Sequence, residues 1–233
     1  MRRDPIEINT FHHVVMRGVR QAPIVHNDID RWDFVKLLYY LNDSFIKRQW
    51  ERDLSNGKCK LFERPSHWPE QDPLVNVCAF CLHDNHFHLL LKEIRDGGIS
   101  LFMQRLPNCL SLRYNKKYEG VGTIFQGSYK SRRVQSDGDL INLGMYIMAK
   151  NVMERCPGGI HAATKNFEKA WKWALNDNFS SFADYASRRA SPIIRKDALG
   201  ELLPSPERFK EEVKQYLQNY QEREELLGGL ALE

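Results

Sequence analysis

The stretch from residue 74 to residue 92 constrains the fold more than any other part of the chain. Residues 74–82 (LVNVCAFCL) are nearly all apolar, as in a strand that is buried on both faces. The next three residues, HDN, supply turn chemistry, and residues 86–92 (HFHLLLK) return as a second strand. The sequence therefore predicts a hairpin at the centre of a sheet that is covered on both sides.

Other elements are expected around this hairpin from the periodicity of the apolar residues. In chain order they are a strand at 11–18, a helix from Asp28 to about Gln49, mostly loop at 51–73, a helix capped by Ser100 and kinked or split at Pro107, a short strand within 124–134, and a helix capped by Asp137. Strands and helices are therefore expected to be interspersed along this part of the chain.

The C-terminal third has a different character. Gly158 and Gly159 are expected to end the helix that Asp137 opens, and the core domain with it. Beyond them come an aromatic cluster at 167–185, a polar linker near 187–203, and a last helix opened by Ser205 and Pro206. We therefore expect a core domain at 1–160 and a mostly helical C-terminal extension at 161–233.

Composition excludes several classes of protein. Apolar residues make up 42% of the chain and charged residues 27%, which is typical of globular domains. No apolar run approaches the roughly 18 residues of a membrane-spanning helix, and the first residues lack the apolar core of a signal peptide. The five cysteines are scattered and odd in number, unlike a disulfide framework. We expect an intracellular protein with reduced thiols and no membrane partner.

Positive charge is concentrated in one part of the chain. The formal net charge of +4 is too small to indicate a polyanionic partner by itself. Between residues 104 and 133, however, seven basic residues stand against one acid, with tyrosines and a phenylalanine interleaved. This pattern suits single-stranded or hairpin DNA, although a solvated helix face is the alternative. The candidate phosphate contacts are Arg113, Lys116, Lys117, Lys130, Arg132 and Arg133.

His86 and His88 are the clearest candidates for metal ligands. Alternation along a strand sends both imidazoles to one face and Phe87 to the other. Two imidazoles on a rigid strand can bind one divalent ion, which would act as a Lewis acid on a phosphodiester oxygen. Two unrelated histidines are the alternative. In the turn, His83 and Asp84 are expected to serve turn formation first and ligation second.

Alternation also limits the other candidate ligands. Cys78 and Cys81 lie three residues apart, so they point to opposite faces of their strand, and no second CxxC pair completes a zinc site. Both are interpreted as small buried residues. His12 and His13 likewise point to opposite faces, so at most one of them can approach the metal.

Tyr146 is the candidate nucleophile. It follows the basic stretch, on the helix opened by Asp137, and shares a helix face with Asn142 and Lys150. A tyrosine beside an apolar stripe is ordinarily a packing residue, and it is the surrounding motifs that favour a catalytic role.

Five motifs in order resemble one family. They are FHHVVMRG at 11–18, CAFCLHDNHFHLLL at 78–91, LFMQRL with LRYNKKY up to 118, TIFQGSYKSRRV at 123–134 and YIMAKN at 146–151. Together they span roughly residues 9–156. This part of the chain resembles the single-tyrosine HUH transposases, which are IS200-like and include the REP-associated tyrosine transposases of bacteria.

The resemblance implies a fold and an activity. It implies an α+β fold with a ferredoxin-like core, in which helices flank a central antiparallel sheet. It also implies that Tyr146 attacks a DNA phosphate, leaving a 5′-phosphotyrosine link and a free 3′-OH. It also implies Mg²⁺ or Mn²⁺ as the cofactor and single-stranded or hairpin DNA as the partner. The protein would then be a monomer or homodimer in the bacterial cytoplasm, associated with the nucleoid when bound.

One departure from the family leaves the third metal ligand open. Relatives have Gln or Asn four residues after the tyrosine, whereas this chain has Lys150, whose ammonium is a poor ligand. Asn151 follows, but five residues of α-helix rotate it about 140° from Tyr146, so it can substitute only if the helix is distorted. The third ligand therefore stays open between positions 150 and 151.

Lys150 also keeps a second function open. The chain is expected to be a DNA nickase and strand transferase, or else a domesticated protein that binds DNA or RNA hairpins and has lost cleavage. A metallohydrolase acting on another substrate is disfavoured, because the further His and Asp ligand motifs of such enzymes are missing.

Overall fold

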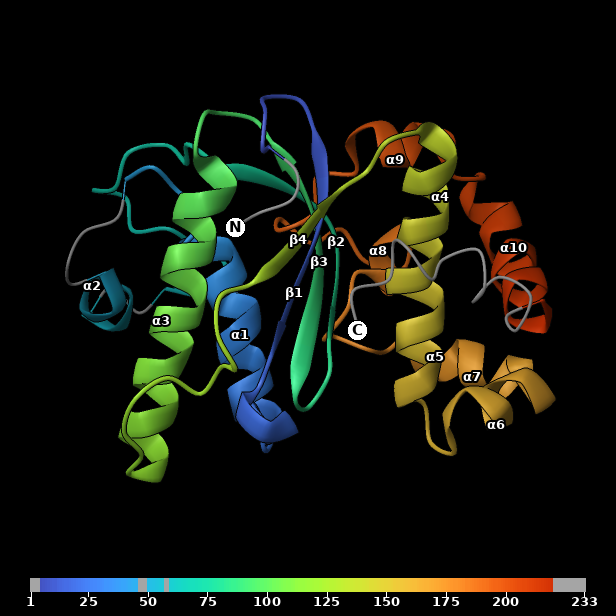
Figure 1. Ribbon diagram of the computed structural model, residues 1–233, viewed down its shortest axis with the longest axis horizontal. Helices are drawn as coiled ribbons and strands as arrows, with labels where there is room; N and C mark the ends of the chain where they lie inside the picture. The colour runs from blue at the N-terminus through green and yellow to red at the C-terminus, as the bar shows by residue number, and fades with distance from the viewer. Residues whose placement is uncertain (1–4, 46–49, 57–58, 220–233) are drawn as a thin grey trace.

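The computed structural model describes residues 5–45, 50–56 and 59–219. Within these residues, helices lie on both sides of a four-stranded antiparallel sheet (Figure 1). The strands are β1 (Phe11–Arg17), β2 (Val75–Leu82), β3 (His86–Glu93) and β4 (Lys130–Arg133). Their order is β2-β3-β1-β4, so the hairpin of β2 and β3 forms one half of the sheet.

The helices of the first half are α1 (Asp28–Tyr40), α2 (Trp50–Asn56) and α3 (Gly98–Tyr118), with a short 3₁₀ helix, η1 (Val19–Gln21). The helix α1 connects β1 to β2, and α3 connects β3 to β4, so the chain follows the β-α-β-β-α-β path of a ferredoxin-like fold. The α+β class and the ferredoxin-like core predicted from the sequence are confirmed.

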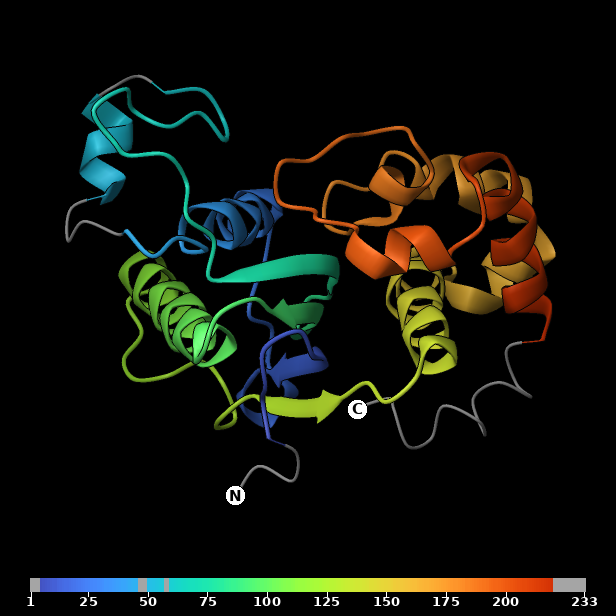
Figure 2. The ribbon, with the colours of Figure 1, turned by 90° about the horizontal axis from the view of Figure 1, so that it is seen from above.

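The two faces of the sheet are covered by different layers (Figure 2). On one face Phe87 of β3 packs against Phe34 of α1, with ring centroids 5.1 Å apart. On the same face Glu93 accepts a 2.6 Å hydrogen bond from the backbone N–H of Ile99, at the start of α3. The other face meets α4 (Asp137–Met145), the π-helix η2 (Tyr146–Lys150) and α5 (Asn151–Arg155).

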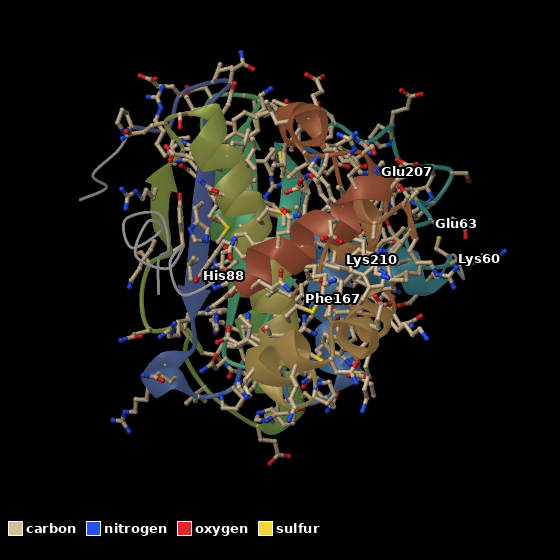
Figure 3. All side chains as sticks on the ribbon, turned by 90° about the vertical axis from the view of Figure 1, so that its right-hand side faces the viewer. Lys60, Glu63, His88, Phe167, Glu207 and Lys210 are labelled. Carbon is tan, nitrogen blue, oxygen red and sulfur yellow. The ribbon has the colours of Figure 1, made fainter. Side chains whose placement is uncertain are left out.

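The chain after residue 158 forms short helices. They are α6 (Gly159–Lys165), α7 (Phe167–Ala174), α8 (Phe182–Tyr185), α9 (Asp197–Leu202) and α10 (Pro206–Gln218). Figure 3 shows Phe167 of α7 and Lys210 of α10 on neighbouring helices, and Lys210 forms a 2.8 Å ion pair with Glu168. The division into a core at 1–160 and an extension at 161–233 stays a prediction.

This C-terminal part also covers the outer edge of β2, which pairs with no strand of the sheet on that side. The backbone N–H of Leu82 donates to the carbonyl of Phe179, and the N–H of Arg195 donates to the carbonyl of Val77. The hydroxyl of Tyr185 donates to the carbonyl of Cys78 at 2.8 Å. These bonds satisfy backbone groups that an edge strand would otherwise present to solvent.

Several predicted boundaries move. The first helix was expected to run to about Gln49, but α1 ends at Tyr40, and residues 46–49 lie outside the described part of the chain. The helix expected from Ser100 begins earlier, at Gly98. It is not split at Pro107, which lies buried inside α3.

Two further expectations are corrected in the second half. The cap of α4 is Ser136 rather than Asp137, and its side chain accepts from the N–H of Asp139 at 3.1 Å. The expected linker near 187–203 contains the helix α9, whose Asp197 pairs with Lys92 of β3 at 2.9 Å. None of the described helices is long and apolar enough to cross a membrane.

Candidate active site

The hairpin of β2 and β3 brings three histidines together. In antiparallel register His88 lies opposite Cys81 of β2 and Val15 of β1, while His86 lies opposite Arg17. Both imidazoles therefore lie on the sheet face that meets η2, as alternation predicts. Figure 3 looks at the sheet through the helical layer on this face, with His88 labelled.

His83 is the third histidine, and it completes a group that could hold a metal ion. One ring nitrogen from each of His83, His86 and His88 lies within 4.8 Å of the other two. The rings of His83 and His86 stack with centroids 4.2 Å apart, and the ring of His86 lies 5.0 Å from that of His88. The sequence interpretation gave His83 to the turn first, and the structure adds it to the cluster.

A sequence signal for His83 exists in the spacing of the turn. The backbone N–H of His83 donates to the carbonyl of His86 at 2.8 Å, so the two residues face each other across the tip of the hairpin. Residues directly opposite in an antiparallel pair point to the same face. The pattern HDNH therefore places its two histidines side by side once residues 84 and 85 are recognised as the turn.

The imidazoles of the cluster are suited to bind a cation. Burial, helped by the nearby charge of His86 and of Arg155, lowers the pKa of His83 to about 2. Burial also holds the pKa of His88 well below its ordinary value, with His13 and His86 contributing. Neutral imidazoles keep a lone pair available for a metal.

Hydrogen bonds indicate which nitrogen each ring offers. Nδ1 of His86 lies 2.6 Å from Oδ1 of Asn85, and Nδ1 of His88 lies 3.0 Å from Nε2 of His13. In both rings Nε2 is then the nitrogen for a metal. Nε2 of His83 is buried and has no hydrogen-bond partner. An orphaned buried nitrogen costs free energy unless something binds it, so the residues present fit a metal ion.

Tyr146 lies beside this cluster. It is the first residue of η2, and its ring centroid is 5.7 Å from that of His88 and 6.2 Å from that of His13. The side chain is 3% exposed. The structure thus brings the predicted nucleophile and the predicted metal ligands to one place, although they lie some sixty residues apart in the chain.

Tyr146 begins the π-helix η2, which runs to Lys150. The backbone N–H of Asn151 donates to the carbonyl of Tyr146, five residues earlier, where an α-helix would use a spacing of four. The local distortion on which a ligand role for Asn151 depends is therefore present. Asn151 is buried and its Nδ2 has no partner.

Lys150 fills the position where an amide was expected. Its Nζ lies 5.2 Å from the centroid of the Tyr146 ring and 3.2 Å from a carboxylate oxygen of Glu154. Its side chain is buried, and its charge contributes to the lowered pKa values of His83 and His88. A buried ammonium at this place can contact an anion but cannot ligate a metal.

Comparison with known proteins agrees with these motifs. Residues 70–150, which run from shortly before β2 to the end of η2, match the family model described as Transposase IS200 like. This segment, about a third of the chain, is similar to the IS200-like transposases. The motifs in the sequence predicted that family, so the prediction is confirmed.

Two further comparisons were made. A solved structure of a REP-associated tyrosine transposase bound to a REP hairpin aligns with 84% of this chain and 89% of its own, at 14% identity and a TM-score of 0.41. No curated protein matches the chain in sequence.

The basic residues of the IS200-like segment lie on two sides of the sheet. In β4 Lys130 lies opposite Val15 and Arg132 lies opposite His13, so both share the face of the histidines. Arg133 lies on the other face and pairs with Glu7 at 2.8 Å.

The three candidates in α3 belong to the opposite helical layer. Arg113 pairs with Asp33 at 2.7 Å and with Glu51 at 2.9 Å, and Lys117 pairs with Asp30. Lys116 is exposed. The sequence did not predict that these three residues lie away from the histidine face. Basic residues that are close together in the sequence do not show on which side of the sheet a helix packs.

Two arginines near the site were missed by the sequence interpretation. Arg17 ends β1 opposite His86, and Arg20 lies in η1 with φ of 52°. Together with Lys130 they line a hollow of about 570 Å³ at the edge of the sheet. The alternation of β1 gives a signal for Arg17, since it shares a face with His13 and Val15.

Proposed function

We propose that this protein is a metal-dependent endonuclease and strand transferase for single-stranded DNA, acting as an IS200-like transposase. The observation that carries the proposal is the position of Tyr146, whose ring lies 5.7 Å from that of His88 in a cluster of three histidines. A tyrosine beside a metal-binding cluster is the arrangement that covalent phosphoryl transfer requires.

The reaction forms one bond and breaks one. Oη of Tyr146 attacks the phosphorus of a DNA phosphodiester, and the bond from phosphorus to the 3′-oxygen breaks. The phenol gives up its proton and the departing 3′-oxygen takes one up, so the products are a 5′-phosphotyrosine and a free 3′-OH. The new ester retains the energy of the phosphodiester, so a second 3′-OH can reverse the step and join another strand.

Each group of the site has a role in this reaction. A divalent ion bound by the histidines would neutralise charge that grows on the phosphate oxygens. Lys150 offers a buried positive charge beside the Tyr146 ring. Lys130 and Arg132, on the same sheet face, hold flanking phosphates. Because Tyr146 is 3% exposed, access of DNA to its hydroxyl requires surrounding elements to move.

A second function is favoured by one observation. Lys150 occupies the position of the expected amide and its ammonium lies against the nucleophile, which suits a protein that holds a DNA or RNA hairpin without cleaving it. In that case the basic residues bind nucleic acid and the metal-binding cluster has a structural role.

Denaturing electrophoresis separates the two functions. Wild-type protein is incubated with labelled hairpin-containing single-stranded DNA and with Mg²⁺, Mn²⁺, Co²⁺ or Zn²⁺. We expect a covalent protein–DNA band that disappears in Tyr146→Phe, whereas binding in a gel-shift assay changes little. The matched control is Tyr114→Phe, since Tyr114 lies on α3 in the opposite helical layer.

Either of two outcomes would contradict the proposal. A covalent band that persists in Tyr146→Phe assigns the nucleophile to another residue. The lack of any band with each of the four metals, alongside tight hairpin binding, favours the binding protein.

A further inference from the structure

We propose that His83, His86 and His88 form a three-imidazole metal site that selects a transition-metal ion such as Zn²⁺ or Co²⁺ over Mg²⁺. This inference rests on the proposed function only for the reaction in which the metal would take part. It assigns His83 as the third ligand, in place of positions 150 and 151, and it changes the class of metal.

The first argument is the buried nitrogen of His83. Nε2 of His83 is the only ring nitrogen among the described histidines that is buried without a hydrogen-bond partner. A buried imidazole nitrogen without a partner loses its bond to water and gains nothing in return. It lies in the group whose ligand atoms are within 4.8 Å of one another, so a bound ion is the partner that the arrangement provides for.

The second argument is the orientation of the other two rings. Asn85 engages Nδ1 of His86, and His13 engages Nδ1 of His88. Ligating histidines characteristically use their second nitrogen for such a bond, which fixes the ring and the tautomer. Nitrogens that bind one ion at about 2.1 Å lie roughly 3.4 Å apart, so separations of up to 4.8 Å shorten by at most about 1.4 Å on binding.

The third argument concerns the class of metal. Imidazole nitrogen suits Zn²⁺, Co²⁺ and other transition-metal ions, whereas Mg²⁺ prefers oxygen ligands and keeps much of its water. A site of three imidazoles offers no oxygen. Catalytic sites of this kind keep one position open, which a phosphate oxygen can fill.

An ion can reach the cluster from solvent. His83 lines a hollow of about 850 Å³ together with Asp84 and Glu154. The hollow lies between the tip of the hairpin and the C-terminal helical part, so the route does not cross the sheet. Lys150 and Asn151 are not needed as ligands in this arrangement.

The test measures metal binding without DNA. Full-length protein stripped with a chelator is titrated with Co²⁺, and visible absorption reports the ligands. We expect one equivalent to give the bands of a low-coordinate nitrogen site, which Zn²⁺ abolishes and a large excess of Mg²⁺ leaves unchanged. Mg²⁺ that displaces Co²⁺ at equal concentration would overturn the choice of metal class.

Substitutions identify the third ligand. We expect His83→Ala to weaken Co²⁺ binding at least about tenfold and to shift the bands. His161→Ala, which removes an exposed histidine from α6, serves as the matched control and leaves binding unchanged. Asn151→Ala is expected to leave it unchanged as well. Wild-type affinity in His83→Ala, or a loss confined to Asn151→Ala, would overturn the assignment.

A measurement on unmodified protein covers the case in which His83→Ala fails to fold. In ¹H–¹⁵N spectra of the imidazoles, Zn²⁺ should shift Nε2 of His83, His86 and His88 but not the ring of His161. An unshifted His83 would overturn the proposal. These metal-binding measurements contain no DNA, so they are independent of the adduct assay. A protein that binds the metal as expected but forms no covalent adduct with DNA would contradict only the proposed function.

Discussion

At the scale of single residues, the hydrogen bond between the rings of His88 and His13 has the widest consequence. It joins Nδ1 of His88 to Nε2 of His13 at 3.0 Å, and the rings stack with centroids 5.2 Å apart. A neutral His88 that offers Nε2 to an ion carries its proton on Nδ1 and donates it to His13. In the proposed metal site His13 would therefore be a positioning residue for the cluster.

Alternation along β1 showed that at most one of His12 and His13 could approach the site, but it could not say which. The choice depends on register: His13 lies opposite Leu90, on the same face as His88, whereas His12 bonds to Thr10 on the other face. Local sequence fixes how neighbouring side chains alternate, and only the pairing with β3 fixes the absolute face.

Lys150 carries the residue-scale prediction. Its ammonium is buried 5.2 Å from the Tyr146 ring, where it can stabilise negative charge on a phosphate under attack. We expect Lys150→Met to slow formation of the covalent adduct roughly a hundredfold, as loss of one such charge does in other enzymes. Quenched time courses on denaturing gels provide the rates.

The control is Lys172→Met, which removes an exposed lysine from α7 and should leave the rate unchanged. A faster reaction in Lys150→Met would mean that the ammonium inhibits the site, as expected for the binding protein. Melting temperatures of both variants exclude a loss of fold as the cause.

At the scale of elements, periodicity predicted the hairpin but not the π-helix. The apolar run at 74–82 and the alternation after the turn each repeat over several residues, so β2 and β3 appear almost as expected. The segment YIMAKN contains no proline or glycine to mark its distortion. The π-helical turn η2 packs against β2 and β3, and such contacts between distant segments leave no local pattern in the sequence.

The contact between α1 and α3 gives the element-scale prediction. Asp30 of α1 is buried and accepts hydrogen bonds from Lys117 and Tyr118 at the end of α3, and from the backbone N–H of His26. Burial raises the pKa of Asp30, but these bonds outweigh it and hold the pKa below its ordinary value. The ionised carboxylate therefore stabilises the folded state.

When the pKa of a carboxyl group is lower in the folded state than in the unfolded state, the protein becomes less stable as the pH falls. The contribution of Asp30 is present above its unfolded pKa of about 3.9 and is lost as pH falls through its folded value. We expect Asp30→Asn to lower the free energy of unfolding by about 1–2 kcal/mol at pH 7, with a smaller difference at pH 3. Urea denaturation at the two pH values measures it, and an equal difference at both would contradict the role of the charge.

At the scale of the whole molecule, the basic residues divide between two layers. Lys130 and Arg132 share the sheet face of the histidines, whereas Arg113 lies in the opposite layer, paired with Asp33 and Glu51. The sequence showed one basic stretch because these residues are close in the chain. The separation appears only when β4 joins the sheet, with Lys130 and Arg132 on the histidine face, and α3 lies on the other side of the sheet.

This division predicts which charges bind DNA. In the proposed reaction, a DNA strand that presents a phosphate to Tyr146 would run along the histidine face, where Lys130 and Arg132 would contact its backbone. We expect the double variant Lys130→Ala, Arg132→Ala to bind single-stranded DNA more weakly than wild type. The slope of log affinity against log salt should also fall by about two, one for each lost phosphate contact.

The matched control removes the same charge from the other layer. Arg113→Ala with Lys116→Ala also lowers the net charge by two, but these residues lie across the sheet from Tyr146. Fluorescence anisotropy at several salt concentrations compares the variants. If net charge alone governs binding, both doubles lose affinity equally. If DNA follows the histidine face, the salt slope falls only in the β4 double, because counterion release counts phosphates in contact rather than total charge.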